Sequence, residues 1–305
     1  MAAVESGPAR QPADAMRSGV LATLAANAGW GFLPLLFYLL DGINPVEVVA
    51  ARTVFSLLVV GLLILGLGQI GDVRAALAHR RTAGTLLLSA LLLAANWLIY
   101  VYAVQTGHVL EGSFGYFTNP MVNVAMGMLF LGERQRPWQS AALVLAFIAI
   151  GIQAIGLGRF PSISLGLALS FGIYGYLRKT VRANSTTGLA VETLLLTPLA
   201  IAYLLWSVAT AGIGPLGDPK SILLLLATGP ATAAPLLLYA YGVQRLRLTT
   251  VGMFQYIAPS IQFLLAITFF GEHLNVVRLA SFVLVWVSLA IFSFDSVRPR
   301  RTAPA

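Results

Sequence analysis

The sequence contains no cysteine, few charged residues and only three histidines. The absence of cysteine excludes disulfide scaffolds, thiolate metal sites and cysteine nucleophiles. The histidines, His79, His108 and His273, lie far apart along the chain. Charged residues make up 10% of the chain, whereas soluble domains contain roughly one quarter. An ordinary soluble domain is therefore not expected.

Motifs for nucleotide binding and for hydrolytic catalysis are missing as well. The sequence contains no Walker A string, no HExxH pair, no GxSxG elbow and no DxDxDG loop. ATP is therefore not expected to drive this chain, and neither a cofactor nor a metal site is expected. No paired carboxylates, histidine cluster or Ser/Lys dyad is visible in the apolar segments, so we do not expect an enzyme.

Apolar residues are abundant instead. They make up 58% of the 305 residues, and the mean hydropathy is +0.84. Because a helix needs roughly 20 residues to cross a bilayer, the chain can hold about ten spans with short links. Residues 68–81 are expected to form one of these links. We predict an all-α membrane protein with ten transmembrane helices at residues 18–40, 45–68, 82–105, 110–131, 137–157, 161–178, 188–211, 221–243, 249–270 and 275–294.

The basic residues favour one orientation of these spans. If the N-terminus is cytoplasmic, fifteen of the 19 lysine and arginine residues lie on the cytoplasmic side. Only Arg159, Lys220 and Arg278 lie on the opposite side. An excess of basic residues in cytoplasmic loops is the usual signal of topology, so both termini are expected in the cytoplasm. The net charge of +8 is then assigned to topology and to anionic lipid headgroups, and not to nucleic acid.

Both ends of the chain are polar. Residues 1–16 are expected to form a disordered cytoplasmic tail, and residues 297–305 a basic cytoplasmic tail. The N-terminal segment does not resemble a signal peptide. The first apolar run starts only after Arg17, is too long for such a peptide and lacks a cleavage-like end.

The chain also repeats itself. The segment YVYAVQ at 100–105 recurs as YAYGVQ 139 residues later, and Pro120 matches Pro259 at the same offset. We interpret residues 17–157 and 158–296 as two homologous halves of five spans each. Because five is odd, the second half must be inverted relative to the first. Inverted repeats are an architecture of secondary transporters, whose site lies near the membrane midplane.

Three longer segments carry a resemblance to a known family. They are NWLIYVYAVQTGHVLEGSFGYFTNPMVNVAMGMLFLGER (96–134), SFGIYGYLRK (170–179) and LTTVGMFQYIAPSIQFLLAITFFGE (248–272). The sequence resembles the EamA-type transporters of the drug/metabolite transporter superfamily, and most closely their RarD branch, over about residues 18–294. This resemblance implies a ten-helix inner-membrane permease with two EamA repeats.

Polar side chains within the apolar segments are candidates for lining a substrate cavity. Such groups are costly in a bilayer, so they tend to face a cavity or a partner helix. Tyr116, Asn119 and Asn123, for example, share one helix face. The alternative is that these side chains hold helices together through hydrogen bonds. The candidate cavity residues are Asn96, Trp97, Tyr100, Tyr116, Asn119, Asn123, Tyr239, Gln255 and Gln262.

Two charged residues lie within predicted spans. Arg52 and Glu192 match in the two halves at an offset of 140 residues. A charge at the centre of a membrane helix costs roughly 2.5–3.5 kcal/mol on the insertion scale. The functional interpretation is substrate anchoring by Arg52 and proton coupling by Glu192. The alternatives are a structural ion pair or two side chains that snorkel to the interface.

Two prolines and three further glutamates have predicted local roles. Pro120 and Pro259 each remove a backbone hydrogen bond within a span, so they are candidate hinges, with static kinks as the alternative. Glu133 and Glu272 follow glycines at span ends and are expected to accept hydrogen bonds from amides of the next helix. Glu111 is expected to cap the start of its own helix, with a proton gate formed together with His108 as the alternative.

These features together predict a secondary transporter in the cell inner membrane. It would move small organic metabolites or drug-like compounds by alternating access, and export is the favoured direction. A channel-like facilitator is the second candidate, and an intramembrane enzyme the third. The expected partners are a small-molecule substrate and membrane lipid, without nucleic acid, and a homodimer is left open.

Overall fold

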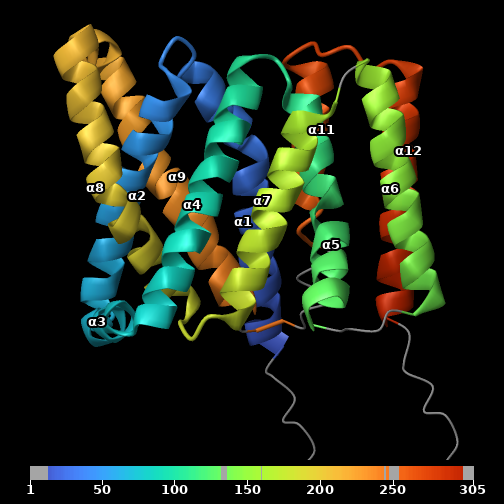
Figure 1. The fold of residues 1–305 in the computed structure, drawn as a ribbon, viewed down its shortest axis with the longest axis horizontal. Helices are drawn as coiled ribbons and strands as arrows, with labels where there is room; N and C mark the ends of the chain where they lie inside the picture. Colours follow the sequence, from blue (N-terminus) through green and yellow to red (C-terminus); the bar gives the residue numbers. More distant parts are fainter. Residues whose placement is uncertain (1–12, 132–135, 159, 244, 247–253, 298–305) are drawn as a thin grey trace, which may run out of the picture.

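The computed structural model describes residues 13–131, 136–158, 160–243, 245–246 and 254–297 (Figure 1). These residues form helices joined by short turns, and no strand occurs among them. A short 3-10 helix, η1 (Gly214–Gly217), precedes α9. In chain order the helices are α1 (Ala13–Leu39), α2 (Pro45–Gly66), α3 (Ile70–Ala78), α4 (Arg80–Gln105), α5 (Val109–Leu131), α6 (Pro137–Leu157), α7 (Ser162–Thr180), α8 (Ser185–Ala211), α9 (Pro219–Val243), α11 (Ile257–Thr268) and α12 (Val276–Val297).

The described helices have the length and polarity of a membrane protein. Seven of them, α1, α2, α4, α6, α8, α9 and α12, are long and apolar enough to cross a bilayer by length and composition. Large apolar side chains such as Leu62 and Ile155 are exposed on the outside of the bundle, where a soluble protein would place polar groups. The all-α membrane class is therefore confirmed. Helices also overlap the other three predicted spans, and the count of ten spans stays a prediction.

Local capping explains several helix boundaries. Asn44 accepts a hydrogen bond from the Val46 amide at the start of α2, where Pro45 occupies the first turn. Asn184 caps α8 in the same way, through the Thr187 amide at 2.7 Å. Gly158 adopts a φ of +62° and ends α6 in the left-handed conformation that favours glycine.

The expected link at residues 68–81 contains a short helix, α3, that was not predicted. This helix packs on α8 and α4 at one end of the bundle. Val73, Ala76 and Leu77 face the protein, whereas Asp72 and Arg74 are exposed. The apolar spacing of three and four residues is that of an amphipathic helix and was readable in the sequence.

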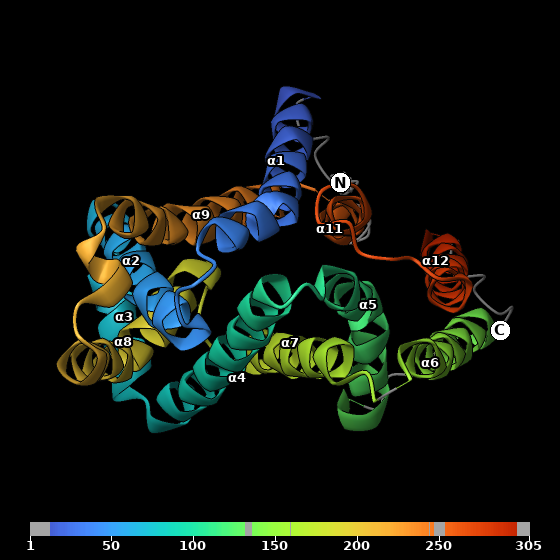
Figure 2. The same ribbon diagram turned by 90° about the horizontal axis from the view of Figure 1, so that it is seen from above.

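Figure 2 shows how the helices are arranged across the bundle. Along one side α4, α7 and α5 lie in a row, and along the other side α9, α1 and α11 do so. The pair α2 and α8 closes one end of the two rows, and the pair α6 and α12 lies at the other. The start of α1 and the end of α12 lie at the same end of the helices (Figure 1).

An aromatic cluster joins the α6–α12 pair to the rest of the protein. Phe282 of α12 is fully buried, and its ring centroid lies 4.6 Å from that of Phe263 on α11. Phe114 and Phe117 of α5 contact the same ring edge-on, and Trp286 completes the group. Because aromatic rings bury large areas, this cluster contributes to holding α12 against α5 and α11.

Candidate functional site

Several predicted cavity residues meet around Asn96 of α4. The Asn96 side chain is 2% exposed, and its amide nitrogen donates to the Leu167 carbonyl oxygen at 3.1 Å and to Ser170 Oγ at 3.0 Å. Its amide oxygen accepts from the Tyr116 hydroxyl at 3.1 Å. Asn96 therefore links α4 to α7 and α5, and its hydrogen-bonding capacity is used within the protein. The hydrogen bonds of Asn96 therefore match the alternative interpretation, in which a polar side chain holds membrane helices together.

Arg52 lies beside this group, where α1, α2, α4 and α9 meet. Its side chain is 4% exposed, about 10 Å along α2 from the start of that helix. The guanidinium carbon lies 4.1 Å from the ring centroid of Trp97 and 5.4 Å from that of Phe37. Arg52 Nε donates to Thr232 Oγ1 at 2.7 Å. The described residues supply no acidic partner to this guanidinium.

The surroundings of Arg52 offset only part of the cost of its burial. A desolvated cation–π contact contributes about 2 kcal/mol. A buried charge left without its partner costs roughly 3–5 kcal/mol. The hydroxyl of Thr232 is neutral and already donates to the Thr228 carbonyl oxygen, so it does not balance the charge. Arg52 is therefore a buried cation whose charge the described protein does not neutralise.

Two other candidates carry buried polar atoms without a partner among the described residues. Tyr100 is buried between the rings of Phe37 and Tyr116, at centroid distances of 6.0 and 5.2 Å, and its hydroxyl makes no hydrogen bond there. The amide oxygen of Asn119 is also buried and unpartnered. Buried polar groups are normally paired, so such exceptions are candidates for ligand contacts.

The candidates from the second half form a separate group. Gln255 Nε2 donates to the Tyr239 hydroxyl at 2.7 Å, and the Tyr239 ring packs on Trp30 of α1. Gln262 Nε2 donates to the Trp30 carbonyl oxygen at 3.2 Å, and its amide oxygen has no partner among the described residues. The predicted set thus divides into two groups, one on α4 and α5 and one on α9, on α11 and in the turn before α11.

The predicted hinge residues are only partly described. Pro120 lies in α5, but its side chain and that of Asn123 are outside the described side chains. Pro259 lies in the first turn of α11, where an amide has no intrahelical acceptor, so among the described residues it marks a helix start. Its carbonyl oxygen accepts from Ser113 Oγ of α5 at 2.7 Å. The hinge role of both prolines stays a prediction.

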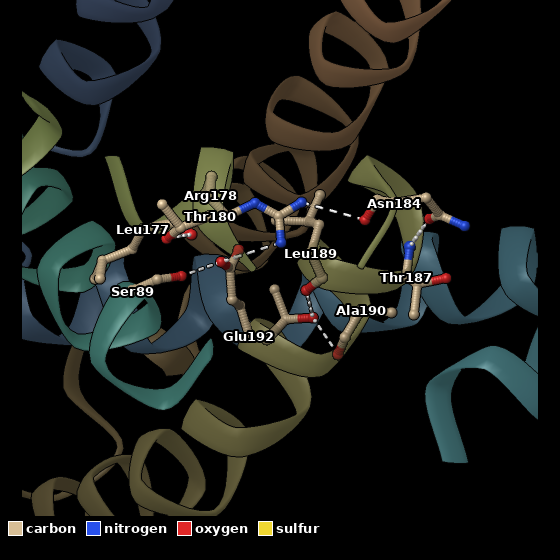
Figure 3. Close-up of polar contacts among 10 residues, drawn as sticks. Ser89, Leu177, Arg178, Thr180, Asn184, Thr187, Leu189, Ala190 and Glu192 are labelled. Carbon is tan, nitrogen blue, oxygen red and sulfur yellow. Dashed lines mark hydrogen bonds and ion pairs between the residues drawn. The ribbon is translucent and has the colours of Figure 1, made fainter. Parts of the chain in front are cut away.

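Glu192 does not contact Arg52 and has its own partners. The Glu192 carboxylate accepts a hydrogen bond from Ser89 of α4 and lies 3.6 Å from Arg178 Nη1 of α7 (Figure 3). Arg178 also donates to the Asn184 carbonyl oxygen at 3.2 Å. The structural ion pair considered between Arg52 and Glu192 is therefore not formed. Glu192 has a counter-ion of its own, within its own half of the chain.

These partners of Glu192 and Arg52 were not predictable from the sequence for two reasons. Arg178 stands at the end of a predicted span and was counted among the cytoplasmic charges that report topology. Ser89 and Thr232 are ordinary hydroxyl residues, and no local pattern pairs them with a charge more than 100 residues away. One signal was available, because both hydroxyls lie on helices that match in the internal repeat.

Two carboxylates accept hydrogen bonds from the first amides of other helices, at the end of the bundle opposite to Glu192. Glu272 accepts hydrogen bonds from the Val109 and Leu110 amides of α5, and not from the next helix as predicted. Glu111 accepts from the Ile163 amide of α7 at 3.3 Å, so it contacts the start of another helix in addition to lying in the first turn of its own. Both predictions were local, whereas each carboxylate reaches across the fold. Glu133 lies outside the described residues.

Comparison with known proteins identifies the family. The sequence model of the EamA-like transporter family matches residues 17–154 and again residues 162–294. The chain belongs to the EamA-like transporter family. It is therefore a multi-pass membrane transporter of the drug/metabolite type, which agrees with the expectation that it is not an enzyme.

Individual relatives support the same assignment. Protein RarD of Escherichia coli K12 is 39% identical over 93% of this chain and 97% of the relative. The transporter YojE of Bacillus subtilis 168 is 35% identical over 94% and 97%. The chloramphenicol-sensitive protein RarD of Pseudomonas aeruginosa PAO1 is 32% identical over 92% and 95%. The predicted RarD-like resemblance is confirmed.

A solved crystal structure has a related fold. It superposes with a TM-score of 0.61 and covers 90% of this chain and 96% of its own, at 17% identity. At this identity the similarity describes the fold alone.

The Glu192 cluster generates a first prediction. Arg178→Gln should lower the apparent melting temperature of the detergent-solubilised protein, because an uncompensated buried carboxylate costs about 3 kcal/mol or more. The double variant Arg178→Gln, Glu192→Gln should recover most of this loss, since the charge is then removed as well. Exposed Arg182→Gln is the control and should melt like the wild type. A double variant no more stable than Arg178→Gln would contradict the ion pair.

The Glu272 contact generates a second prediction. Burial raises the pKa of Glu272 to about 7, although the Leu110 and Val109 amides favour the ionised form. The folded protein therefore binds this proton more tightly than the unfolded chain does. The contribution of this bound proton to the free energy of unfolding is complete below the ordinary pKa of 4.5 and is lost as the pH rises to about 7.

The expected result is a melting temperature that falls between about pH 5 and 7, with a smaller fall in Glu272→Gln. Melting curves of both proteins in one detergent, measured across this range, provide the comparison. Equal slopes in the two proteins would show that Glu272 does not titrate there.

Proposed function

We propose that this protein is a secondary carrier of small organic metabolites or drug-like compounds in the cell inner membrane. In this proposal ten spans form two inverted halves, residues 17–157 and 158–296, with both termini in the cytoplasm. The two halves move against each other, so that a site near the midplane opens to one side of the membrane at a time. Export is the favoured direction.

The observation that carries the proposal is the pattern of helix packing. If the halves match, then α1, α2, α4, α5 and α6 correspond to α7, α8, α9, α11 and α12. Three pairs of counterparts pack on each other, namely α2 on α8, α5 on α11 and α6 on α12. The packing of α1 on α9 corresponds to that of α7 on α4, and α1 on α11 corresponds to α7 on α5. Such correspondence is expected of two repeats related by a pseudo-two-fold axis.

Two independent features support the same arrangement. The family model matches the chain twice, once in each proposed half. The start of α1 and the end of α12 lie at one end of the bundle, as an even number of spans requires (Figure 1). The basic residues of the sequence favour the cytoplasm for that end.

The polar groups suit a carrier site. Tyr100 and Asn119 lie on α4 and α5, and Arg52 of α2 contacts residues of α1, α4 and α9. All three residues retain polar atoms that the described protein does not satisfy. Carriers place their substrate sites between the repeats, within the membrane. The name of one relative mentions chloramphenicol sensitivity, which favours organic compounds over inorganic ions as the transported class.

Counterflow in proteoliposomes tests the carrier proposal. Vesicles that contain the purified protein are preloaded with an unlabelled compound from a metabolite library, selected first by growth of deletion and overexpression strains. A carrier should accumulate the labelled compound transiently above equilibrium, and protein-free vesicles should not. Entry that only approaches equilibrium, without saturation, would instead indicate a channel.

The proposed topology has a separate test, because the chain has no cysteine of its own. Single cysteines at exposed Asp41 and Asp218 should react with an impermeant maleimide added outside intact cells. Cysteines at exposed Ala78 and Thr180 should react only after the membrane is opened. Labelling of Ala78→Cys from outside would overturn the proposed orientation.

A further inference from the structure

We propose that the compound bound at the centre of this transporter carries a carboxylate, which binds the guanidinium of Arg52, next to an apolar or aromatic body that packs on Trp97. This inference rests on the proposed function, since it names the substrate class of the same central site. It depends on the chemistry around Arg52 and not on the direction or energetics of transport.

The first observation is the unused hydrogen-bonding capacity of Arg52. A guanidinium has five N–H donors, and Arg52 makes one hydrogen bond, from Nε to Thr232. The terminal nitrogens Nη1 and Nη2 make no hydrogen bond or ion pair to the described residues, although the side chain is 4% exposed. The edge formed by these two nitrogens is the one that binds a carboxylate through two parallel hydrogen bonds.

The second observation is the contrast with the matching position in the other half. Arg52 on α2 and Glu192 on α8 occupy corresponding positions in the two halves. Arg52 contacts the hydroxyl of Thr232 on α9, and Glu192 contacts the hydroxyl of Ser89 on α4. Because α4 and α9 also correspond, the two contacts are equivalent in the two halves. Glu192 additionally has Arg178 as its counter-ion. Arg52 has no such partner in the described protein. The missing negative charge is therefore placed on the ligand.

The third observation is the shape and polarity of the neighbouring groups. Trp97 lies 4.1 Å from the guanidinium carbon, and Phe37 contacts both this cation and the ring of Tyr100. The buried Tyr100 hydroxyl has no partner among the described residues, so it is a free donor for a second carboxylate contact. Aromatic walls beside a cation and a free hydroxyl fit an amphipathic carboxylate better than an inorganic anion.

Matched probes separate charge from shape. Purified full-length protein in detergent is titrated at pH 7.5 with benzoate, benzamide or benzylamine, which share a ring and differ in charge. Sodium sulfate at the same ionic strength controls for general effects of anions. We expect benzoate to raise the apparent melting temperature in a saturable manner, with little effect of the other three compounds.

Variants assign the effect to Arg52. Arg52→Gln should weaken the apparent binding of benzoate at least ten-fold, and Arg52→Lys should weaken it less, because the charge is retained without the planar fork. Trp97→Leu should also weaken it, and exposed Arg182→Gln should bind benzoate like the wild type. Without ligand, Arg52→Gln should melt no lower than the wild type, since it removes an unneutralised buried charge. A purely structural arginine would instead give a lower melting temperature.

Three results would overturn the inference. These are stabilisation by benzamide or sulfate equal to that by benzoate, retention of the benzoate effect in Arg52→Gln, or no effect of benzoate on the wild type. The measurement does not require transport. Benzoate binding that depends on Arg52 in a protein that shows no counterflow would contradict the proposed function alone, and counterflow without this binding would contradict the inference alone.

Discussion

The constraint on which this structure depends is that the membrane interior offers no water to its polar groups. Many polar side chains in the described helices are satisfied by hydrogen bonds within their own helix. Thr23, Thr53 and Thr193 donate to carbonyl oxygens four residues earlier in their own helices. Others, such as Asn96, meet this constraint by joining two helices. Buried polar atoms that do neither occur at several places in the bundle, and the guanidinium of Arg52 in addition carries a charge that no described residue neutralises.

The two ends of the bundle and its centre differ in this respect. At one end Glu272 and Glu111 accept hydrogen bonds from the starts of α5 and α7, and at the other Glu192 is held by Ser89 and Arg178. Each of these carboxylates has a donor or a counter-ion on another helix, although Oε2 of Glu192 makes no hydrogen bond to the described residues. Arg52, between the ends, has no counter-ion among the described residues. A protein with paired charges towards its ends and an unneutralised cation within its centre has the polarity expected of a carrier site.

Much of this could be predicted from the sequence, because it depends on local composition and spacing. The all-α membrane class follows from the apolar runs, and the proximity of Asn96 and Tyr116 from polar residues at matching depth on consecutive helices. The partners of Glu192 and Glu272 could not be predicted, since a counter-ion or a capped helix is chosen by tertiary packing. Pro259 shows the same limit, because α11 begins two residues before it, and a proline alone does not distinguish a helix start from a kink within a span.

The central claim is that the two halves move against each other around one site. Spin labels at Asp41 and Asp218 report the separation of the halves at one end, and labels at Ala78 and Thr180 report it at the other. Distance distributions from double electron–electron resonance in lipid provide the most direct test. The account predicts two populations for each pair, with the distance at one end lengthening when the other shortens. A single distribution for both pairs, unchanged by any transported compound, would contradict it.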